Sequence, residues 1–305
     1  MSIHQFAACG IVLAMMISTI ALSSEQDVTR TDIIKDGAIE IEIFLHGNGP
    51  ETLIMASGNG RPATDLNDLA KRIASNGYRV VTYNYRSISK SKGPLSGITL
   101  HDLAQDVWRI ADALKVGKVH LAGKTYGNRV IRTASADKPK RVLSVILIGC
   151  GGEILPSPEV QKKYKRYTDP GISEEEWLRL QGELNFAPGN EHLAKLSAEH
   201  GKYPELANAQ IKASDRTPKN EWIGAGTAPM LVLTGLQDIV AVPENGLKIA
   251  KERPNSWLVG IPKCGHNMVF EQPDAIKNLV VAFIQSNAVR MAGRSPDKPF
   301  RKEIM

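Results

Sequence analysis

Cysteine is scarce in this chain, which has three cysteines in 305 residues. One of them, Cys9, lies in an apolar N-terminal segment, and Cys150 and Cys264 are the two that follow it. Two cysteines make no disulfide framework of the kind that stabilises small secreted proteins. We therefore expect two free thiols near the ends of buried strands. The 42% of hydrophobic residues is enough for a large apolar core.

Internal repeats and low-complexity tracts are also absent, which argues against a fibrous or disordered protein. The formal net charge is +6, and much of it lies in two runs, residues 162–166 and 290–302. Neither run forms a stripe of alternating aromatic and basic residues of the kind that suits nucleic acid. We interpret both runs as solvated surface and expect no nucleic-acid partner.

One segment without any charge stands apart from the rest of the chain. Residues 6–22 are apolar, small or hydroxylic, and they end in small residues before an acidic stretch. This pattern is typical of a secretory signal with cleavage near Ala21 or Ser23, although no Lys or Arg precedes it. We expect residues 1–24 to be a signal peptide and the protein to be exported, to the periplasm or beyond. The length of the segment also suits a marginal membrane anchor, which is the alternative.

From residue 28 onward, strand-like and helix-like patterns alternate. Short apolar or alternating runs predict strands at residues 38–45, 52–56, 78–82, 118–122, 141–148, 230–234 and 256–261. Amphipathic patterns predict helices at residues 65–75, 99–114, 128–136, 243–251 and 273–288. Strands that alternate with helices of this length indicate an α/β protein with a parallel sheet and crossover helices.

Residues 153–222 break the alternation because they contain no strong strand pattern. Ser173 with Glu176 predicts a capped helix, and Asn190 can cap a second one. Since both ends of the segment leave the same sheet edge, we expect a helical lid over that edge. The predicted organisation is a signal peptide at 1–24, a core at 28–152 and 223–289, a lid at 153–222 and a basic tail at 290–305.

The stretch LAGKTYG, residues 121–127, has two interpretations. Its Gly-Lys-Thr resembles the end of a phosphate-binding loop, but the first glycine of that motif would have to stand at Lys118. The preceding residues also follow a strand pattern, and amides that pair in a sheet cannot wrap a phosphate. The other interpretation is a tight strand-to-helix turn, with Thr125 between Gly123 and Gly127 as the nucleophile.

Two further loops follow predicted strands. The strand at 230–234 is followed by Gly-Leu-Gln-Asp with Asp238, and the strand at 256–261 by Lys-Cys-Gly-His with His266. From about residue 37 to 288 the chain resembles the α/β-hydrolase fold family, whose chain order is nucleophile, acid, histidine. The resemblance implies a mostly parallel sheet with helices on both faces. It also implies a triad of Thr125 as nucleophile, Asp238 as acid and His266 as base.

The resemblance implies an oxyanion hole made of two backbone amides. Tyr126, the residue after the nucleophile, supplies one, and Asn59, in the loop after the strand at 52–56, supplies the other. The pair His46-Gly47 is familiar from the family, but it precedes that strand and is expected in an earlier hairpin. In the Asn59 loop, Arg61 is expected to face solvent.

Other ionisable residues receive weaker interpretations. Glu153 follows the strand at 141–148, where some family members carry their acid, and it is the alternative to Asp238. No pattern ties the four histidines at positions 101, 120, 192 and 200 to the site, so packing or surface roles are expected for them. No metal or organic cofactor is expected.

Thr125 departs from the serine that is usual in the family. A β-branched residue at the positive φ of such a turn is strained by about 1–3 kcal/mol. The favoured hypothesis is an exported hydrolase that cleaves a carboxylic ester or related small acyl substrate through an acyl-enzyme on Thr125. The alternatives are a noncatalytic ligand-binding protein, and lyase or transfer chemistry in which His266 is the base without a covalent intermediate.

Overall fold

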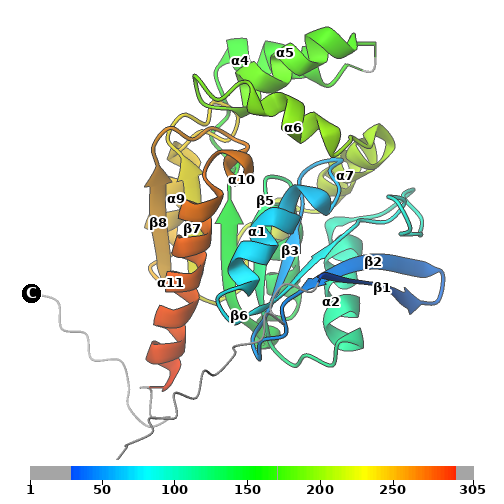
Figure 1. Cartoon of the computed structure of the whole chain (residues 1–305), viewed down its shortest axis with the longest axis vertical. Coiled ribbons are helices and arrows are strands. Elements are labelled where there is room, and N and C mark those ends of the chain that lie inside the picture. The colour runs from blue at the N-terminus through cyan, green and yellow to red at the C-terminus, as the bar shows by residue number, and fades with distance from the viewer. Residues whose placement is uncertain (1–28, 170, 293–305) are drawn as a thin grey trace, which may run out of the picture.

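The computed structural model describes residues 29–169 and 171–292, with side chains up to residue 287 (Figure 1). The signal peptide or anchor expected at residues 1–24 lies outside the described residues, as does the basic tail from residue 293. Residues 290–292 of that tail belong to the last helix, α11. Within the described ranges, no helix is long and apolar enough to span a membrane.

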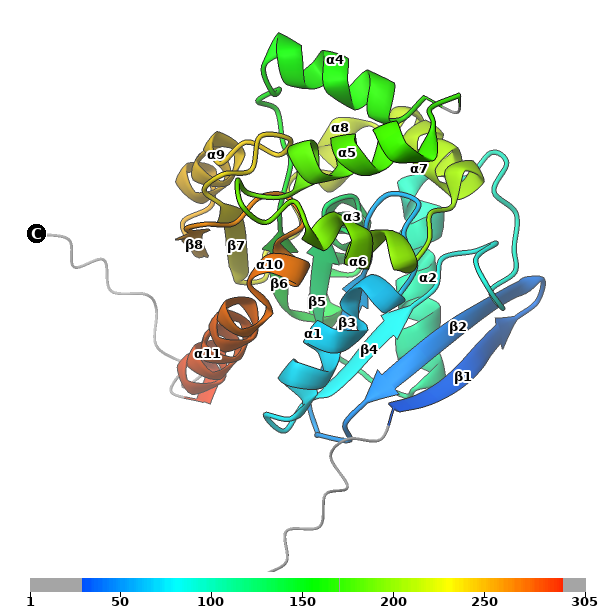
Figure 2. The same ribbon diagram turned by 45° about the horizontal axis from the view of Figure 1, so that its top comes forward.

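The centre of the fold is one eight-stranded sheet in the order β1-β2-β4-β3-β5-β6-β7-β8. Its strands β3 to β8 are parallel, and β1 and β2 form an antiparallel hairpin whose second strand pairs antiparallel with β4 (Figure 2). The strands are β1 (Thr29–Asp36), β2 (Ile39–His46), β3 (Thr52–Ala56), β4 (Arg79–Tyr83), β5 (Val119–Lys124), β6 (Val142–Ile148), β7 (Met230–Gly235) and β8 (Ser256–Ile261).

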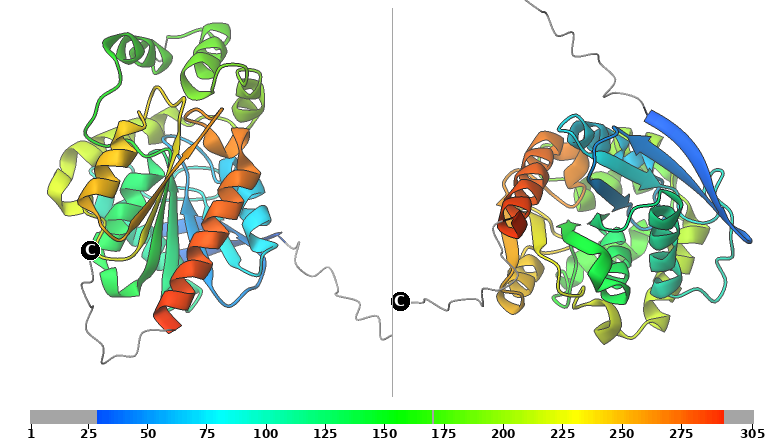
Figure 3. Two further views of the ribbon diagram at one scale, coloured as in Figure 1. Left: turned by 90° about the vertical axis from the view of Figure 1, so that its left-hand side faces the viewer. Right: turned by 90° about the horizontal axis from the view of Figure 1, so that it is seen from below.

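Helices cover both faces of the sheet, because alternate residues of the central strands are apolar on each side. One face carries α1 (Thr64–Ala74), α10 (Met268–Glu271) and α11 (Pro273–Ala292), and the other carries α2 (Leu100–Ala113), α3 (Gly127–Asp137) and α9 (Glu244–Glu252). Figure 3 shows the sheet edge-on between these two layers. The α/β fold predicted from the sequence is confirmed.

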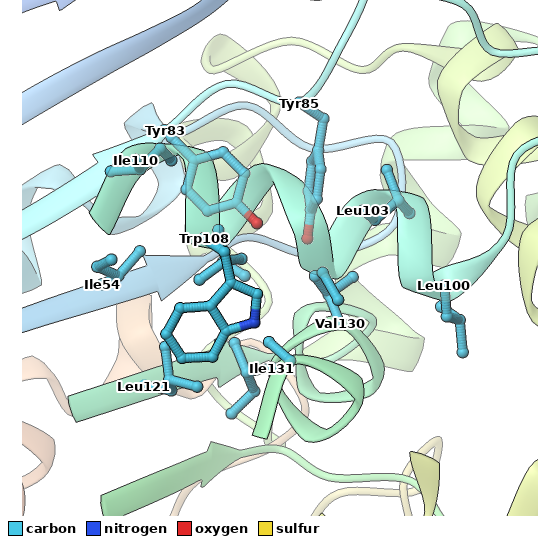
Figure 4. Packing of buried hydrophobic residues seen from close by; sticks show 14 of the residues in the cluster. Ile54, Tyr83, Tyr85, Leu100, Leu103, Trp108, Ile110, Leu121, Val130 and Ile131 are labelled. Carbon is cyan, nitrogen blue, oxygen red and sulfur yellow. The ribbon is translucent and has the colours of Figure 1, made fainter. Parts of the chain in front are cut away.

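The core on the α2 and α3 side contains the bulkiest buried side chain. Trp108 of α2 is fully buried and lies beside Leu121 of β5 and Ile131 of α3 (Figure 4). Tyr83 and Tyr85 pack edge to face next to it, with ring centroids 5.3 Å apart. This packing fixes β5 against α2 and α3, and therefore fixes the turn that joins β5 to α3.

Residues 153–222, which we call the insertion, lie between β6 and β7 and contain only helices: α4 (Pro158–Tyr167), α5 (Glu174–Asn185), α6 (Leu193–Glu199), α7 (Pro204–Arg216) and α8 (Lys219–Trp222). Helices α4, α5 and α6 lie above the carboxyl ends of the parallel strands (Figures 1 and 2). Helix α4 has no buried residue, so the basic run at residues 162–166 belongs to a solvated helix.

Several local expectations need correction. The residues between β2 and β3 do not form a hairpin, because β4 separates these two strands in the sheet. Asn190 does not cap α6, since its side chain donates to Lys263 and Glu271 instead. Ser173 caps α5, but the Glu176 side chain pairs with Arg166 and does not complete a capping box.

Candidate active site

The turn between β5 and α3 has the geometry that its glycines suggest. Thr125 has φ of +51°, in the left-handed region that L residues seldom adopt. A Cβ at Gly127 would lie 2.2 Å from the Ala56 carbonyl oxygen, and one at Gly123 would lie 2.5 Å from the Asn128 nitrogen. Only glycine fits at either position, so Thr125 stands at the tip of a tight turn at the carboxyl end of β5.

Asp238 and His266, predicted from two separate loops, are in direct contact. His266 Nδ1 lies 2.8 Å from Asp238 Oδ2. The other carboxylate oxygen accepts the amides of Val240 and Ala241 at 2.9 and 2.7 Å, and the Asp238 side chain is fully buried. Because a carboxylate only accepts hydrogen bonds, Nδ1 carries the proton of this bond, so the tautomer selected for the neutral ring has its lone pair on Nε2.

Glu271 anchors the loop that carries His266. Its Oε2 accepts the Gly265 amide at 2.7 Å, and its Oε1 accepts the Ala187 amide at 2.7 Å and the Asn190 side-chain amide at 2.9 Å. Since Ala187 and Asn190 belong to the insertion, Glu271 joins the His266 loop to the insertion. This explains physically why an acidic residue follows the histidine at this spacing.

The Thr125 side chain lies over the loop that follows β3. Its Oγ1 is 2.6 Å from the position that a Cβ on Gly58 would occupy. Among the described residues, no hydrogen bond joins Thr125 to the His266 ring, although both line one cavity. Nucleophile-to-base contacts are often long when no substrate is bound and shorten in the complex.

The two amides expected to form an oxyanion hole also lie beside Thr125. Within residues 29–169 and 171–292, neither the Asn59 nor the Tyr126 backbone N–H donates to another protein group. The side chains of both residues contact helix α7. Asn59 Nδ2 donates to Gln210 Oε1 at 3.1 Å, and the Tyr126 hydroxyl donates to the Gln210 carbonyl.

A cavity of about 320 Å³ opens between the carboxyl ends of the strands and the insertion. Thr125 and His266 lie at its floor, while the insertion supplies most of its wall. Four aromatic side chains of the insertion line it: Tyr164, Tyr167, Trp177 and Tyr203. Such a cavity suits a substrate with a planar apolar part.

A buried charge cluster adjoins the floor of the cavity. The fully buried Asp65 carboxylate accepts Lys124 Nζ at 2.8 Å and two bonds from the Arg61 guanidinium, at 2.9 and 2.7 Å. His200 Nδ1 lies 3.2 Å from its Oδ1. The Phe270 ring packs at a tilt against His200, and its centroid lies 5.1 Å from Lys124 Nζ. The cluster thus holds two full positive charges and one negative charge.

Electrostatics within this cluster follow from burial. Burial alone would raise the pKa of the Asp65 carboxyl, but Lys124, His200 and Arg61 outweigh it and hold that pKa well below its usual range. Burial lowers the pKa of the Lys124 ammonium, and Asp65 opposes this effect. Arg61 and Lys124 both line the cavity, so a ligand there meets an excess of positive charge.

The cluster corrects two expectations. Arg61 does not face solvent, because its side chain is only 12% exposed and is held by Asp65 and by the Ser197 carbonyl of the insertion. His200, for which the sequence suggested no link to the site, does not line the cavity but contacts Asp65 in the adjoining cluster. Arg61 and Asp65 are four residues apart at the start of α1, and this spacing is the feature of the sequence that could have predicted their ion pair.

The other candidates lie elsewhere. Glu153 is exposed and pairs with Lys219 and Lys248, so it does not orient His266. His46 is buried at the end of β2, where it contacts Thr29. Cys150 and Cys264 are both buried and free. The described part of the chain contains no cluster of three or more potential metal ligands.

Known proteins resemble this chain in sequence and in fold. The family described as "alpha/beta hydrolase fold" matches residues 43–179. The chain is 26% identical over 269 residues to 2-hydroxy-6-oxo-6-phenylhexa-2,4-dienoate hydrolase of Burkholderia cepacia, covering 81% of this chain and 88% of that protein. It is also 26% identical over 269 residues to a 2-hydroxy-6-oxononadienedioate/2-hydroxy-6-oxononatrienedioate hydrolase of Dechloromonas aromatica, covering 82% of this chain and 93% of that protein.

Solved structures share the fold. An esterase of Exiguobacterium antarcticum superposes with a TM-score of 0.72 at 18% identity, covering 85% of this chain and 99% of that one. A 2-hydroxy-6-oxo-6-phenylhexa-2,4-dienoate hydrolase of Rhodococcus superposes with a TM-score of 0.68 at 18% identity, covering 85% and 100%. This family match, the shared fold and the similarity to hydrolases show that the chain has the α/β-hydrolase fold and is a hydrolase.

Proposed function

We propose that this hydrolase cleaves a small acyl substrate, a carboxylic ester or a related carbonyl compound, with Thr125, His266 and Asp238 as its triad. The observation that supports the proposal is the Asp238–His266 pair, whose histidine lines the same cavity as Thr125. If the Asp238–His266 pair only stabilised the fold, the strained turn that carries Thr125 would have no function beside it. A pure binding protein would not need the histidine held in one tautomer.

The proposed reaction has two halves. Thr125 Oγ1 attacks the carbonyl carbon while His266 Nε2 takes its proton, and the Asn59 and Tyr126 amides stabilise the oxyanion. The tetrahedral intermediate collapses, the leaving group takes the proton from His266, and an acyl-enzyme remains. Water then attacks the acyl carbon with His266 as base, which releases the acid and restores Thr125.

A second candidate reaction is hydrolysis of a carbon–carbon bond next to a ketone. The relatives are named for 6-oxo-dienoates, which carry a ketone and a carboxylate but no ester, so their hydrolysis must break a carbon–carbon bond. The excess of positive charge from Arg61 and Lys124 at the cavity floor favours such an anionic substrate. An assay of 4-nitrophenyl acetate beside 2-hydroxy-6-oxo-6-phenylhexa-2,4-dienoate compares the two reactions directly.

Replacing the nucleophile tests the triad. We expect Thr125→Ser to keep or raise ester hydrolysis, because serine has the hydroxyl without the strained, crowding methyl, and Thr125→Ala to abolish it. The measurement is turnover of 4-nitrophenyl acetate together with labelling by a fluorophosphonate. If only Thr125→Ser is labelled, the wild type is a binding protein or uses His266 alone. If neither protein is labelled or turns over any aryl ester, the triad assignment is wrong.

Export of the protein remains a prediction from residues 1–24 alone. A membrane anchor through residues 6–22 is its alternative.

A further inference from the structure

Helix α7 of the insertion contacts the loop after β3 through one glutamine. Gln210 Oε1 accepts the Gly60 backbone amide at 2.7 Å and Asn59 Nδ2 at 3.1 Å. Asn59 Nδ2 also donates to the Ala207 carbonyl at 3.1 Å. The Gly60 carbonyl in turn accepts the Tyr203 amide at 2.9 Å. The Gly60 backbone, which follows Asn59, is therefore held by Gln210 of α7 and by Tyr203, the residue that precedes α7.

The same glutamine is bonded to the turn that carries the nucleophile. The Tyr126 hydroxyl donates to the Gln210 backbone carbonyl, and it accepts a bond from Ser214, also on α7, at 3.3 Å. Tyr126 is 8% exposed and Gln210 is fully buried, so water does not compete with these bonds. One residue thus touches both loops that supply the proposed oxyanion-hole amides, from an element more than 80 positions away in the sequence.

Burying the Gln210 side chain costs folding free energy that an apolar side chain at this position would not cost. Its Nε2 has no hydrogen-bond partner among the described residues, and a buried unpartnered amide group destabilises a protein. An apolar side chain of similar size would fill the same space without this cost. The glutamine instead supplies an acceptor, and that acceptor serves only the Asn59 and Gly60 groups of the oxyanion loop.

We propose that Gln210 is a positioning residue that sets the two oxyanion-hole amides, those of Asn59 and Tyr126, at their working separation and so couples the insertion to catalysis. This proposal rests on the proposed function, since it assumes that these amides stabilise the oxyanion. Gln210 itself does not line the cavity and does not touch the substrate.

The test compares three variants. Gln210→Met keeps the shape and removes the acceptor. Gln210→Glu keeps an acceptor oxygen in the same place. Lys212→Met, on the exposed side of α7, is the matched control. Each variant is assayed with 4-nitrophenyl acetate for kcat and KM, and by thermal unfolding.

We expect Gln210→Met to lower kcat about ten- to hundredfold with KM changed less than about threefold. Such a loss is a fraction of that caused by deleting an oxyanion donor. Gln210→Glu should recover to within about fivefold of the wild-type kcat, and Lys212→Met should match the wild type. An unchanged kcat in Gln210→Met would overturn the proposal. So would an equal loss in Gln210→Glu, or a loss confined to KM.

A second measurement does not depend on activity. Amide hydrogen exchange of peptides covering residues 56–62 and 124–128 reports whether the two loops are held in place. Gln210→Met should speed exchange of the 56–62 peptide by about tenfold, because this loop bonds to the glutamine side chain. The 124–128 peptide should change less, because Tyr126 bonds to the Gln210 backbone carbonyl. Lys212→Met should leave both peptides unchanged. If the wild type proves inactive on every substrate, the proposed function fails. Faster exchange would then still establish that Gln210 positions these loops, and unchanged exchange would overturn that as well.

Discussion

Replacing Asp65 by asparagine should destabilise the protein far more than replacing its partner Lys124 by methionine. The buried Asp65 carboxylate contacts two cations, Lys124 and Arg61, whose side chains are only 2% and 12% exposed. Asparagine leaves both charges buried without a counterion. Breaking a buried pair in this way costs about 3–5 kcal/mol.

The reverse substitution leaves a balanced pair. In Lys124→Met, Asp65 keeps its two bonds from Arg61, and the surplus positive charge of the cluster is gone. Lys124→Met loses one charge-assisted hydrogen bond, but it also removes the desolvation penalty of a buried surplus charge. We therefore expect the free energy of unfolding to fall by only about 1 kcal/mol. The two variants should therefore differ by at least about 2 kcal/mol in the free energy of unfolding.

Urea unfolding at pH 7.5, followed by far-ultraviolet circular dichroism, measures this difference, provided that both variants share one m-value. The pH dependence gives a second check. Because the folded-state pKa of Asp65 is depressed, its stabilising contribution is present above the unfolded pKa of about 4 and is lost as the pH falls below that value. If Lys124→Met costs as much as Asp65→Asn, the charge count is wrong and Lys124 is a required counterion.

Two further predictions concern a buried histidine and the Thr125 hydroxyl. Burial lowers the pKa of His120 to about 4. The unfolded chain therefore binds a proton more readily between about pH 6.5 and 4, and stability falls as the pH falls through that window. The wild type should lose about 2 kcal/mol of unfolding free energy from pH 7.5 to 5 through this group. His120→Gln should flatten the profile by that amount in urea titrations, and an unchanged slope would contradict it. Gly58→Ala places a Cβ 2.6 Å from Thr125 Oγ1 and should lower kcat at least about a hundredfold with the melting temperature nearly unchanged. Full activity in this variant, measured with 4-nitrophenyl acetate, would exclude Thr125 as the nucleophile in its present rotamer.

The sequence predicted the parts of this fold that depend on local pattern. Strand β3 and strand β8 have the predicted bounds, because short apolar runs between turn residues are strong signals. Asp238 and His266 could be selected because each lies in a loop after a predicted strand, in the chain order that the resemblance to the α/β-hydrolase family implies, and the structure brings them into contact.

The features that the sequence did not reveal depend on exposure or on distant contacts. Strand β1 was missed because it is polar and mostly exposed, and its only strand partner is β2. Helix α4 was missed because most of its residues are charged and exposed, and its few partly buried ones, such as Val160 and Tyr167, make only a weak apolar signal. The contacts of Gln210 with Asn59 and Tyr126 span 151 and 84 positions, and no local pattern in a single sequence encodes such a pairing.

The two ends of the insertion differ in how much mutation they can absorb. Substitutions at the exposed side chains of α4, among them Tyr164 at the cavity, cost little folding free energy, whereas Tyr167 stacks on Trp177 and bonds to Gln181. Helix α7 buries Leu206, Ala209, Gln210 and Ala213, and a change there also disturbs the loops beneath it. New substrate preferences can therefore be acquired most readily through α4, because its exposed residues can change without disturbing the loops that carry the proposed catalytic groups.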